Sequence, residues 1–128
     1  MLMHLISVAT GGALGALTRY GIGLVISSPS IGLPAYIATI SVNIVGCGIM
    51  GIMAALLQHN PAIAANIRPF VMIGFLGALT TFSSFALDSF HLLEKQQYVT
   101  MAAYMSLSFI LSLSAFLIMY HAVKWGLA

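Results

Sequence analysis

The chain has very few charged side chains for its size. Its 128 residues include two acidic residues and four Lys or Arg residues, whereas a soluble domain carries about 25% charged residues. So few charges cannot build an ordinary solvated surface, which excludes a soluble domain. The net charge of +2 is too small and too scattered for a nucleic-acid-binding surface. We therefore expect an integral membrane protein that lies in a lipid bilayer and binds no nucleic acid.

Cysteine is almost absent, and groups typical of a catalytic site are absent as well. The single Cys47 can form neither a disulfide framework nor a cysteine-based metal site. The four histidines show no metal-binding spacing, and no Ser/His/acid arrangement can be argued. The sequence therefore predicts a protein that is not an enzyme.

Long apolar segments dominate the sequence. Connections are predicted where Pro, Asn, Ser or charged residues gather, at residues 27–34, 59–66 and 94–97. Four segments remain between them, at about residues 3–26, 35–58, 67–93 and 98–124. Each reaches the roughly 20 residues that cross a bilayer as a helix, and their apolar residues do not alternate as in a barrel strand. We expect one all-α domain over residues 1–128 with four transmembrane helices.

The basic residues give almost no bias for the orientation in the membrane. Arg68 and Lys124 would lie on the side of the termini, and Lys95 and, more remotely, Arg19 on the other side. Two alternatives stay open: insertion in both orientations, which permits an antiparallel homodimer, or one topology set weakly by Lys124 and Arg68. Four short helices can hardly enclose a pathway and shield it from lipid, so we expect an oligomer.

The third segment contains the unusual polar run GALTTFSSF at residues 77–85. Gly74 and Gly77 lower the helix propensity there. Four hydroxyl side chains can bond to nearby backbone instead of continuing the helix: Thr80, Thr81, Ser83 and Ser84. The run predicts either two half-helices that meet near the membrane midplane or an unbroken helix with back-bonded hydroxyls. A break would offer carbonyl groups to a small cation and N–H and O–H groups to an anion.

Other polar side chains lie within the second and fourth segments. Asn43 predicts either a hydrogen bond between helices or a donor that points into a pore. Tyr104, Ser108 and Ser112 follow an i, i+4, i+8 spacing, which places three hydroxyls on one helix face; they either join helices or form a polar track. Neutral donors suit an anion, since a cation pathway usually has buried acids and Asp88 is the one acid well inside a segment.

Three motifs carry a resemblance to a known family: GGALGALTRY at 11–20, SVNIVG at 41–46 and GFLGALTTFSSF at 74–85. Through them the chain resembles, over essentially its whole length, the Fluc (CrcB) family of small bacterial fluoride channels. The resemblance implies an antiparallel, dual-topology homodimer with two fluoride pores in the bacterial cytoplasmic (inner) membrane. It also implies passive, fluoride-selective export from the cytoplasm that confers fluoride resistance.

The resemblance also implies roles for individual residues. Phe82 and Phe85 would match the pore-facing ring pair of the family, and Asn43 its donor in the second segment. Further residues would lie in or beside the fluoride pathway, namely Thr81, Ser83, Ser84, Tyr104, Ser108 and Ser112.

A structural Na⁺ at the dimer interface would be held by the backbone carbonyls of Gly77 and Thr80 from both subunits, and Arg19 would serve the vestibule. The chain departs from the family at Ala78, where a second glycine is frequent, and at Asp88, where a longer acid is common.

Two alternative functions remain from the residues themselves. A small multidrug-type, proton-coupled antiporter of organic cations can also have four short segments and dual topology. Such a transporter needs a carboxylate within the membrane, typically in the first segment, and residues 3–26 contain none. An assembly subunit without a transport role would not explain the hydroxyl run at residues 80–84.

Overall fold

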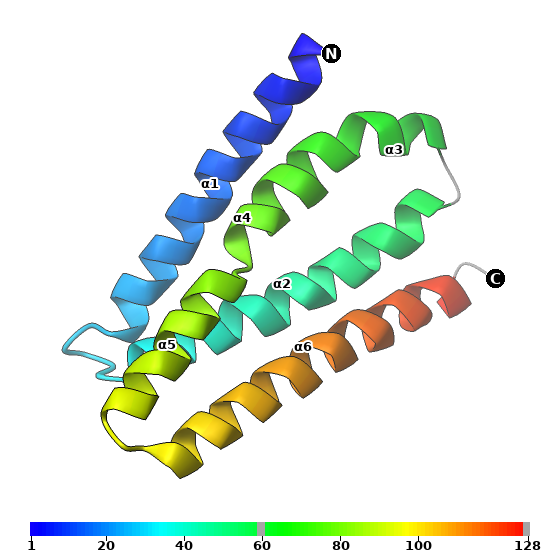
Figure 1. The fold of residues 1–128 in the computed structure, drawn as a ribbon. Coiled ribbons are helices and arrows are strands. Elements are labelled where there is room, and N and C mark those ends of the chain that lie inside the picture. Colours follow the sequence, from blue (N-terminus) through cyan, green and yellow to red (C-terminus); the bar gives the residue numbers. More distant parts are fainter. Residues whose placement is uncertain (59–60, 127–128) are drawn as a thin grey trace.

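The computed structural model describes residues 1–58 and 61–126, and every regular element in these ranges is helical (Figure 1). The elements are α1 (Leu2–Ile26), α2 (Ala35–Gln58), α3 (Pro61–Arg68), the π-helix η1 (Pro69–Leu76), α4 (Gly77–Leu79), α5 (Phe82–Glu94) and α6 (Tyr98–Gly126). The prediction of an all-α protein is confirmed.

Three helical segments of the described chain are long and apolar enough to cross a membrane. They are Ala35–Gln58, Pro61–Glu94 and Tyr98–Gly126, with mean hydropathies of 2.1, 1.8 and 1.9. Helix α1 has a span's length, at 25 residues, but it includes five glycines and Arg19. Apolar membrane-spanning helices are thus confirmed for three of the four predicted segments, and the count of four stays a prediction.

The third segment begins earlier than the sequence indicated. A connection was expected over residues 59–66, whose first two residues lie outside the described ranges. Residues 61–66 belong to α3, with Pro61 at the first helical position, where the missing N–H costs nothing. The connection is therefore shorter than expected.

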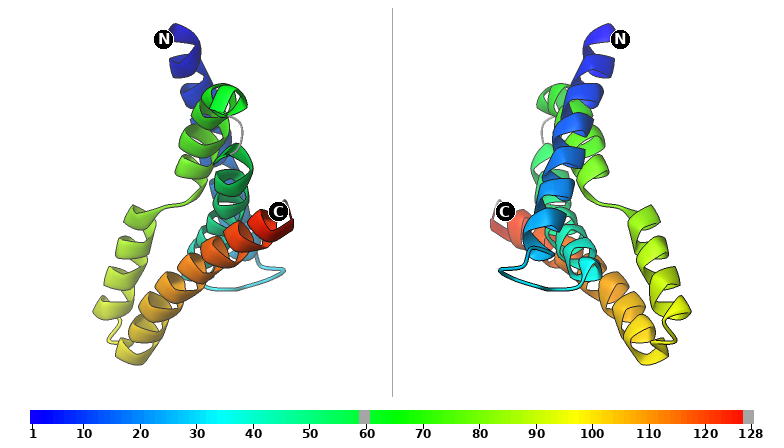
Figure 2. Two further views of the ribbon diagram at one scale, coloured as in Figure 1. Left: turned by 90° about the vertical axis from the view of Figure 1, so that its right-hand side faces the viewer. Right: turned by 90° about the vertical axis from the view of Figure 1, so that its left-hand side faces the viewer.

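Neighbouring helices pack in parallel pairs, because the chain alternates direction along the bundle (Figures 1 and 2). Helix α1 lies along η1, and α2 lies along α6. Glycines bring these backbones together: a Cβ at Gly15 would overlap the Phe75 carbonyl, and one at Gly51 would overlap the Phe116 carbonyl. Close approach through small residues is how helices associate in lipid.

The chain is extended at Thr80 (φ −79°, ψ 149°) and Thr81 (φ −153°, ψ 126°), between α4 and α5. The third segment is therefore broken, at two residues rather than over the longer glycine-containing stretch. Gly74 is helical and allows α1 to approach, since a Cβ there would lie 2.8 Å from the Val8 carbonyl oxygen. Ala78 also lies in a helical turn. After the break, α5 leads away from η1 and α4 (Figure 2).

Candidate functional site

Asn43 on α2 holds the break in place through both atoms of its amide group. Its Nδ2 donates to the Thr81 carbonyl oxygen at 3.1 Å, and its Oδ1 accepts from the Thr81 N–H at 2.8 Å. This pairing fixes the orientation of the amide group. It also gives hydrogen-bond partners to the Thr81 N–H and carbonyl groups, which lie outside a regular helix at the break. Asn43 thus makes a hydrogen bond between helices, and it also lines a groove. Both roles predicted for it, the bond between helices and the pore donor, therefore stay open.

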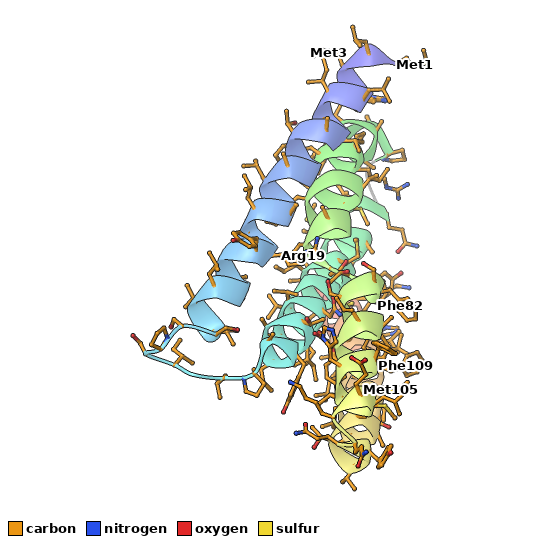
Figure 3. The ribbon with its side chains drawn as sticks, turned by 60° about the vertical axis from the view of Figure 1, so that its left-hand side comes forward. Met1, Met3, Arg19, Phe82, Met105 and Phe109 are labelled. Atoms are coloured by element: carbon orange, nitrogen blue, oxygen red, sulfur yellow. The ribbon has the colours of Figure 1, made fainter. Side chains whose placement is uncertain are left out.

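The hydroxyl run begins α5 and joins it to α1. Thr81 is the N-cap residue of α5, and its Oγ1 accepts from the Ser84 N–H at 3.1 Å. The Oγ atoms of Ser83 and Ser84 lie 3.1 and 3.3 Å from the same oxygen. Arg19 reaches from α1 toward the start of α5 (Figure 3), where its Nη1 donates to Ser84 Oγ at 3.1 Å. The hydroxyls therefore cap the N-terminus of α5, and the Arg19 guanidinium binds to this cap.

The break also changes the hydrogen bonding of nearby carbonyls. In an unbroken helix the Thr81 N–H would donate to the Gly77 carbonyl, but here it donates to Asn43. Gly77 and Thr80 both line the groove, and Gly77 is exposed in the single chain. No cluster of three His, Cys, Asp or Glu side chains that could hold a metal occurs in residues 1–58 and 61–126. Free carbonyl oxygens at a helix break are groups that can hold a small hard cation.

A groove of about 750 Å³ runs between the break and helices α2 and α6. Two of its hydroxyl groups, Ser108 Oγ and Ser112 Oγ, are buried without a hydrogen-bond partner in the described part of the chain. Tyr104 lies near Ser108 and Cys47 near Ser112, but neither pair reaches hydrogen-bond geometry. Buried hydroxyls without partners are costly, so these two are available to a ligand.

Aromatic rings run from the groove along α5. The Phe82 and Phe85 centroids are 5.4 Å apart, those of Phe85 and Tyr104 are 5.4 Å apart, and Tyr36 lies 5.5 Å beyond Tyr104. The Phe82 side chain is 80% exposed and lies at the same outer edge as Phe109 (Figure 3). This edge of the groove is open in the single chain.

Tyr104 ends this run in a polar contact. Its ring is 3% exposed, and its hydroxyl donates to Asp88 Oδ2 at 3.2 Å. The sequence analysis placed both residues but did not predict that they pair, because their 16-residue separation spans the turn between α5 and α6.

Comparison with known proteins identifies the family. The sequence model of the "CrcB-like protein, Camphor Resistance (CrcB)" family matches residues 6–120. The chain belongs to the CrcB-like family. The resemblance seen in the sequence is thereby confirmed, and the matched range includes every residue of the groove.

Several curated CrcB-like relatives carry the name fluoride-specific ion channel FluC. The protein of Paracoccus denitrificans is 44% identical over 110 residues, which cover 86% of each chain. That of Rhodospirillum centenum is 43% identical over 110 residues, or 84% of this chain and 85% of the relative. That of Saccharophagus degradans is 37% identical over 110 residues, or 86% and 81%.

In this CrcB-like chain the predicted site residues divide into two groups. One group lines the groove, and comprises Asn43, Gly77, Thr80, Thr81, Phe82, Phe85, Ser108 and Ser112. The other lies next to it without lining it, and comprises Arg19, Ser83, Ser84 and Tyr104. The groove is also lined by four residues that were not among the predicted site residues, Cys47, Phe109, Leu113 and Phe116. Cys47 follows Asn43 by four residues, so the helical face shared with Asn43 was the available signal.

Proposed function

We propose that this protein is a fluoride-specific channel of the bacterial inner membrane, through which fluoride leaves the cytoplasm passively. The observation that carries the proposal is the groove with unpartnered Ser108 and Ser112 hydroxyls, in a chain that belongs to a family with relatives named as fluoride channels. The protein is a transporter of ions rather than an enzyme, and its export of fluoride would confer resistance.

The groove offers the donors that a dehydrated fluoride ion needs. Asn43 uses one of its two amide hydrogens on Thr81, and the Ser108 and Ser112 hydroxyls have no acceptor among the residues that the structure describes. The ring edges of Phe82 and Phe85 carry the positive side of the aromatic quadrupole. Neutral donors of this kind hold the ion firmly enough to replace its water and weakly enough to release it.

The remaining predicted residues would serve the same pathway. Thr81 lines the groove at the start of α5, and Ser83 and Ser84 lie next to it. Tyr104 continues the row of Ser108 and Ser112. Arg19 bonds to Ser84 and would place a positive field near the passing anion.

The working unit would be an antiparallel homodimer of four-span subunits with dual topology. A pathway open along one edge leaks into lipid, and this groove is open where Phe82 and Phe109, 80% and 70% exposed, stand at its rim. A second copy placed there would cover the groove and bury both rings. Two copies give two such grooves, and hence two pores.

A structural Na⁺ at the dimer interface would be held by the Gly77 and Thr80 carbonyls of both subunits. Two observations support carbonyl ligands for this ion. The Thr81 N–H donates to Asn43 instead of the Gly77 carbonyl, and Gly77 is exposed. Such an ion would supply a fixed positive charge near the pathway without contacting the anion directly.

The test is anion efflux from liposomes that contain the purified protein, measured with a fluoride electrode. We expect fluoride efflux without chloride efflux from wild-type protein. Phe82→Ile and Asn43→Asp are expected to abolish fluoride efflux, since one removes a ring edge and the other replaces a donor with a negative charge. Phe90→Ile is the matched control, because Phe90 is exposed on α5 outside the groove and its loss leaves the donors intact.

Two outcomes of this efflux experiment would contradict the fluoride-channel function. Equal fluoride and chloride efflux, or proton-coupled uptake of an organic cation, would overturn the assignment. The antiporter alternative lacks structural support in α1, whose residues Leu2–Ile26 contain no acid.

A further inference from the structure

A second cavity, of about 680 Å³, lies at the end of the molecule where α5 turns into α6. Figure 1 shows the start of α2, the end of α5 and the start of α6 together at this end. Asp88 and His91 of α5 and Lys95, the C-cap residue that follows this helix, line the cavity. Tyr36 and Tyr98 line it from α2 and α6. The cavity therefore combines an acid, a cation and an imidazole.

A chain of contacts connects this cavity to the groove. Asp88, which lines the cavity, accepts the hydrogen bond from Tyr104 at 3.2 Å. The Tyr104 ring is 5.4 Å from the ring of Phe85, which lines the groove. The cavity and the groove are thus connected through the contacts of Asp88, Tyr104 and Phe85, which places the cavity at one end of the proposed pathway.

The charge of the cavity depends on His91. The Lys95 cation balances the Asp88 carboxylate, and the other titratable residues in the cavity lining are Tyr36 and Tyr98. Imidazole is the side chain whose charge ordinarily changes between pH 5 and 8. Protonation of His91 would therefore change the summed side-chain charge of the cavity from zero to +1.

The surrounding backbone adds to the positive potential that an entering anion meets. Residues Pro34–Tyr36 and Tyr98–Thr100, at the beginnings of the long helices α2 and α6, line the cavity, and helix N-termini are positive ends of the helix dipole. One helix C-terminus, that of α5, opposes them. Two positive ends against one negative end add to the effect of Lys95 and His91.

The turn that carries these groups is held in one conformation. Gln96 adopts a left-handed backbone (φ 56°), the Gln97 N–H donates to the Leu92 carbonyl at 2.9 Å, and the Gln96 N–H donates to the Leu93 carbonyl at 2.9 Å. This pair of bonds is the Schellman arrangement that closes a helix. Lys95 is the C-cap residue inside this closed turn, so its position at the cavity is defined.

We propose that this cavity is an anion-collecting mouth of the pathway, and that protonation of His91 increases fluoride entry as the pH falls. The proposal rests on the fluoride-channel function proposed above. A mouth whose summed charge is positive raises the local concentration of anions and the rate at which they enter.

The experiment measures initial fluoride efflux from liposomes at low ionic strength, with equal pH on both sides. Protein-free liposomes report the leak of hydrogen fluoride through lipid, which is subtracted. We expect wild-type efflux to rise about two- to five-fold between about pH 8 and pH 5.5. His91→Gln is expected to keep the rate that wild-type protein shows near pH 8 and to lose the rise.

Three further variants separate the contributions. Lys95→Gln should lower efflux at every pH and retain the relative rise, and its deficit should shrink at high salt because screening weakens steering. Asp88→Asn should keep the rise if His91 carries it. His4→Gln is the matched control, because His4 is exposed near the start of α1, away from the cavity lining, and should respond to pH as wild-type protein does.

The outcomes distinguish this proposal from the channel function. A wild-type rate that does not change with pH, or the same rise in His91→Gln, overturns the proposal while fluoride conduction stands. Loss of the rise in Asp88→Asn assigns the effect to the carboxylate and also overturns it. Absence of fluoride-selective efflux at every pH instead defeats the channel function itself.

Discussion

At the scale of the residue, removing the Ser108 hydroxyl should change the stability of the protein and its fluoride conduction in opposite directions. Its hydroxyl is buried, with 5% of the residue exposed, and has no hydrogen-bond partner within the described ranges. Removing an unsatisfied buried hydroxyl relieves a cost of about 1–3 kcal/mol. If the hydroxyl serves the passing anion, the same change removes a donor from the pathway.

We therefore predict that Ser108→Ala unfolds at an equal or higher temperature in detergent but conducts fluoride about tenfold or more slowly, as the loss of one bond to a charged group implies. Ser89→Ala is the control, because the Ser89 hydroxyl is buried but already donates to the Phe85 carbonyl at 2.8 Å. It should conduct normally. A Ser108→Ala channel that conducts at the wild-type rate would remove Ser108 from the pathway.

At the scale of the element, α1 packs closely against η1 because the glycines at this contact have no side chain. A Cβ at Gly15 would overlap the Phe75 carbonyl, which is backbone and cannot rotate away, whereas a Cβ at Gly12 would meet nothing within 4 Å. We predict that Gly15→Ala lowers stability by about 1–3 kcal/mol through overpacking. Gly12→Ala should be neutral or slightly stabilising, because alanine favours a helix.

Thermal unfolding of the two purified variants, followed by fluorescence, gives the comparison. Similar losses for Gly12→Ala and Gly15→Ala would show that helix propensity, rather than the close contact with η1, determines the effect.

The break in the third segment could be predicted from the sequence only in part. The density of hydroxyls at residues 80–84 predicted either a break or an unbroken helix with back-bonded hydroxyls, and the structure has extended backbone at Thr80 and Thr81. The sequence could not locate it more closely, because the glycines nearby are used for packing: Gly74 faces α1. The pairing of Asn43 with the Thr81 peptide and the π-helix before it depend on how separate helices meet, which no local pattern contains.

At the scale of the whole molecule, the open groove and the balanced charges point to the same arrangement. The exposed rings of Phe82 and Phe109 need a cover. A second copy in the opposite orientation needs a chain without a strong positive-inside bias. Arg68 and Lys124 oppose Lys95 and Arg19 in this respect, so the basic residues favour neither orientation, as the proposed dual topology requires.

Dual topology can be measured by labelling single cysteines at the two ends of α2, in a Cys47→Ser background that leaves no other thiol. Ser30→Cys and Ala62→Cys place thiols at exposed positions on opposite ends of this 24-residue helix, which spans about 36 Å. With a membrane-impermeant maleimide on intact cells, we expect about half of each variant to be labelled if both orientations occur equally. Permeabilised cells should show complete labelling of both. If one variant is fully labelled and the other unlabelled in intact cells, the chain has a single topology and the antiparallel homodimer is wrong, since the two copies would then have to cover each other's grooves in parallel.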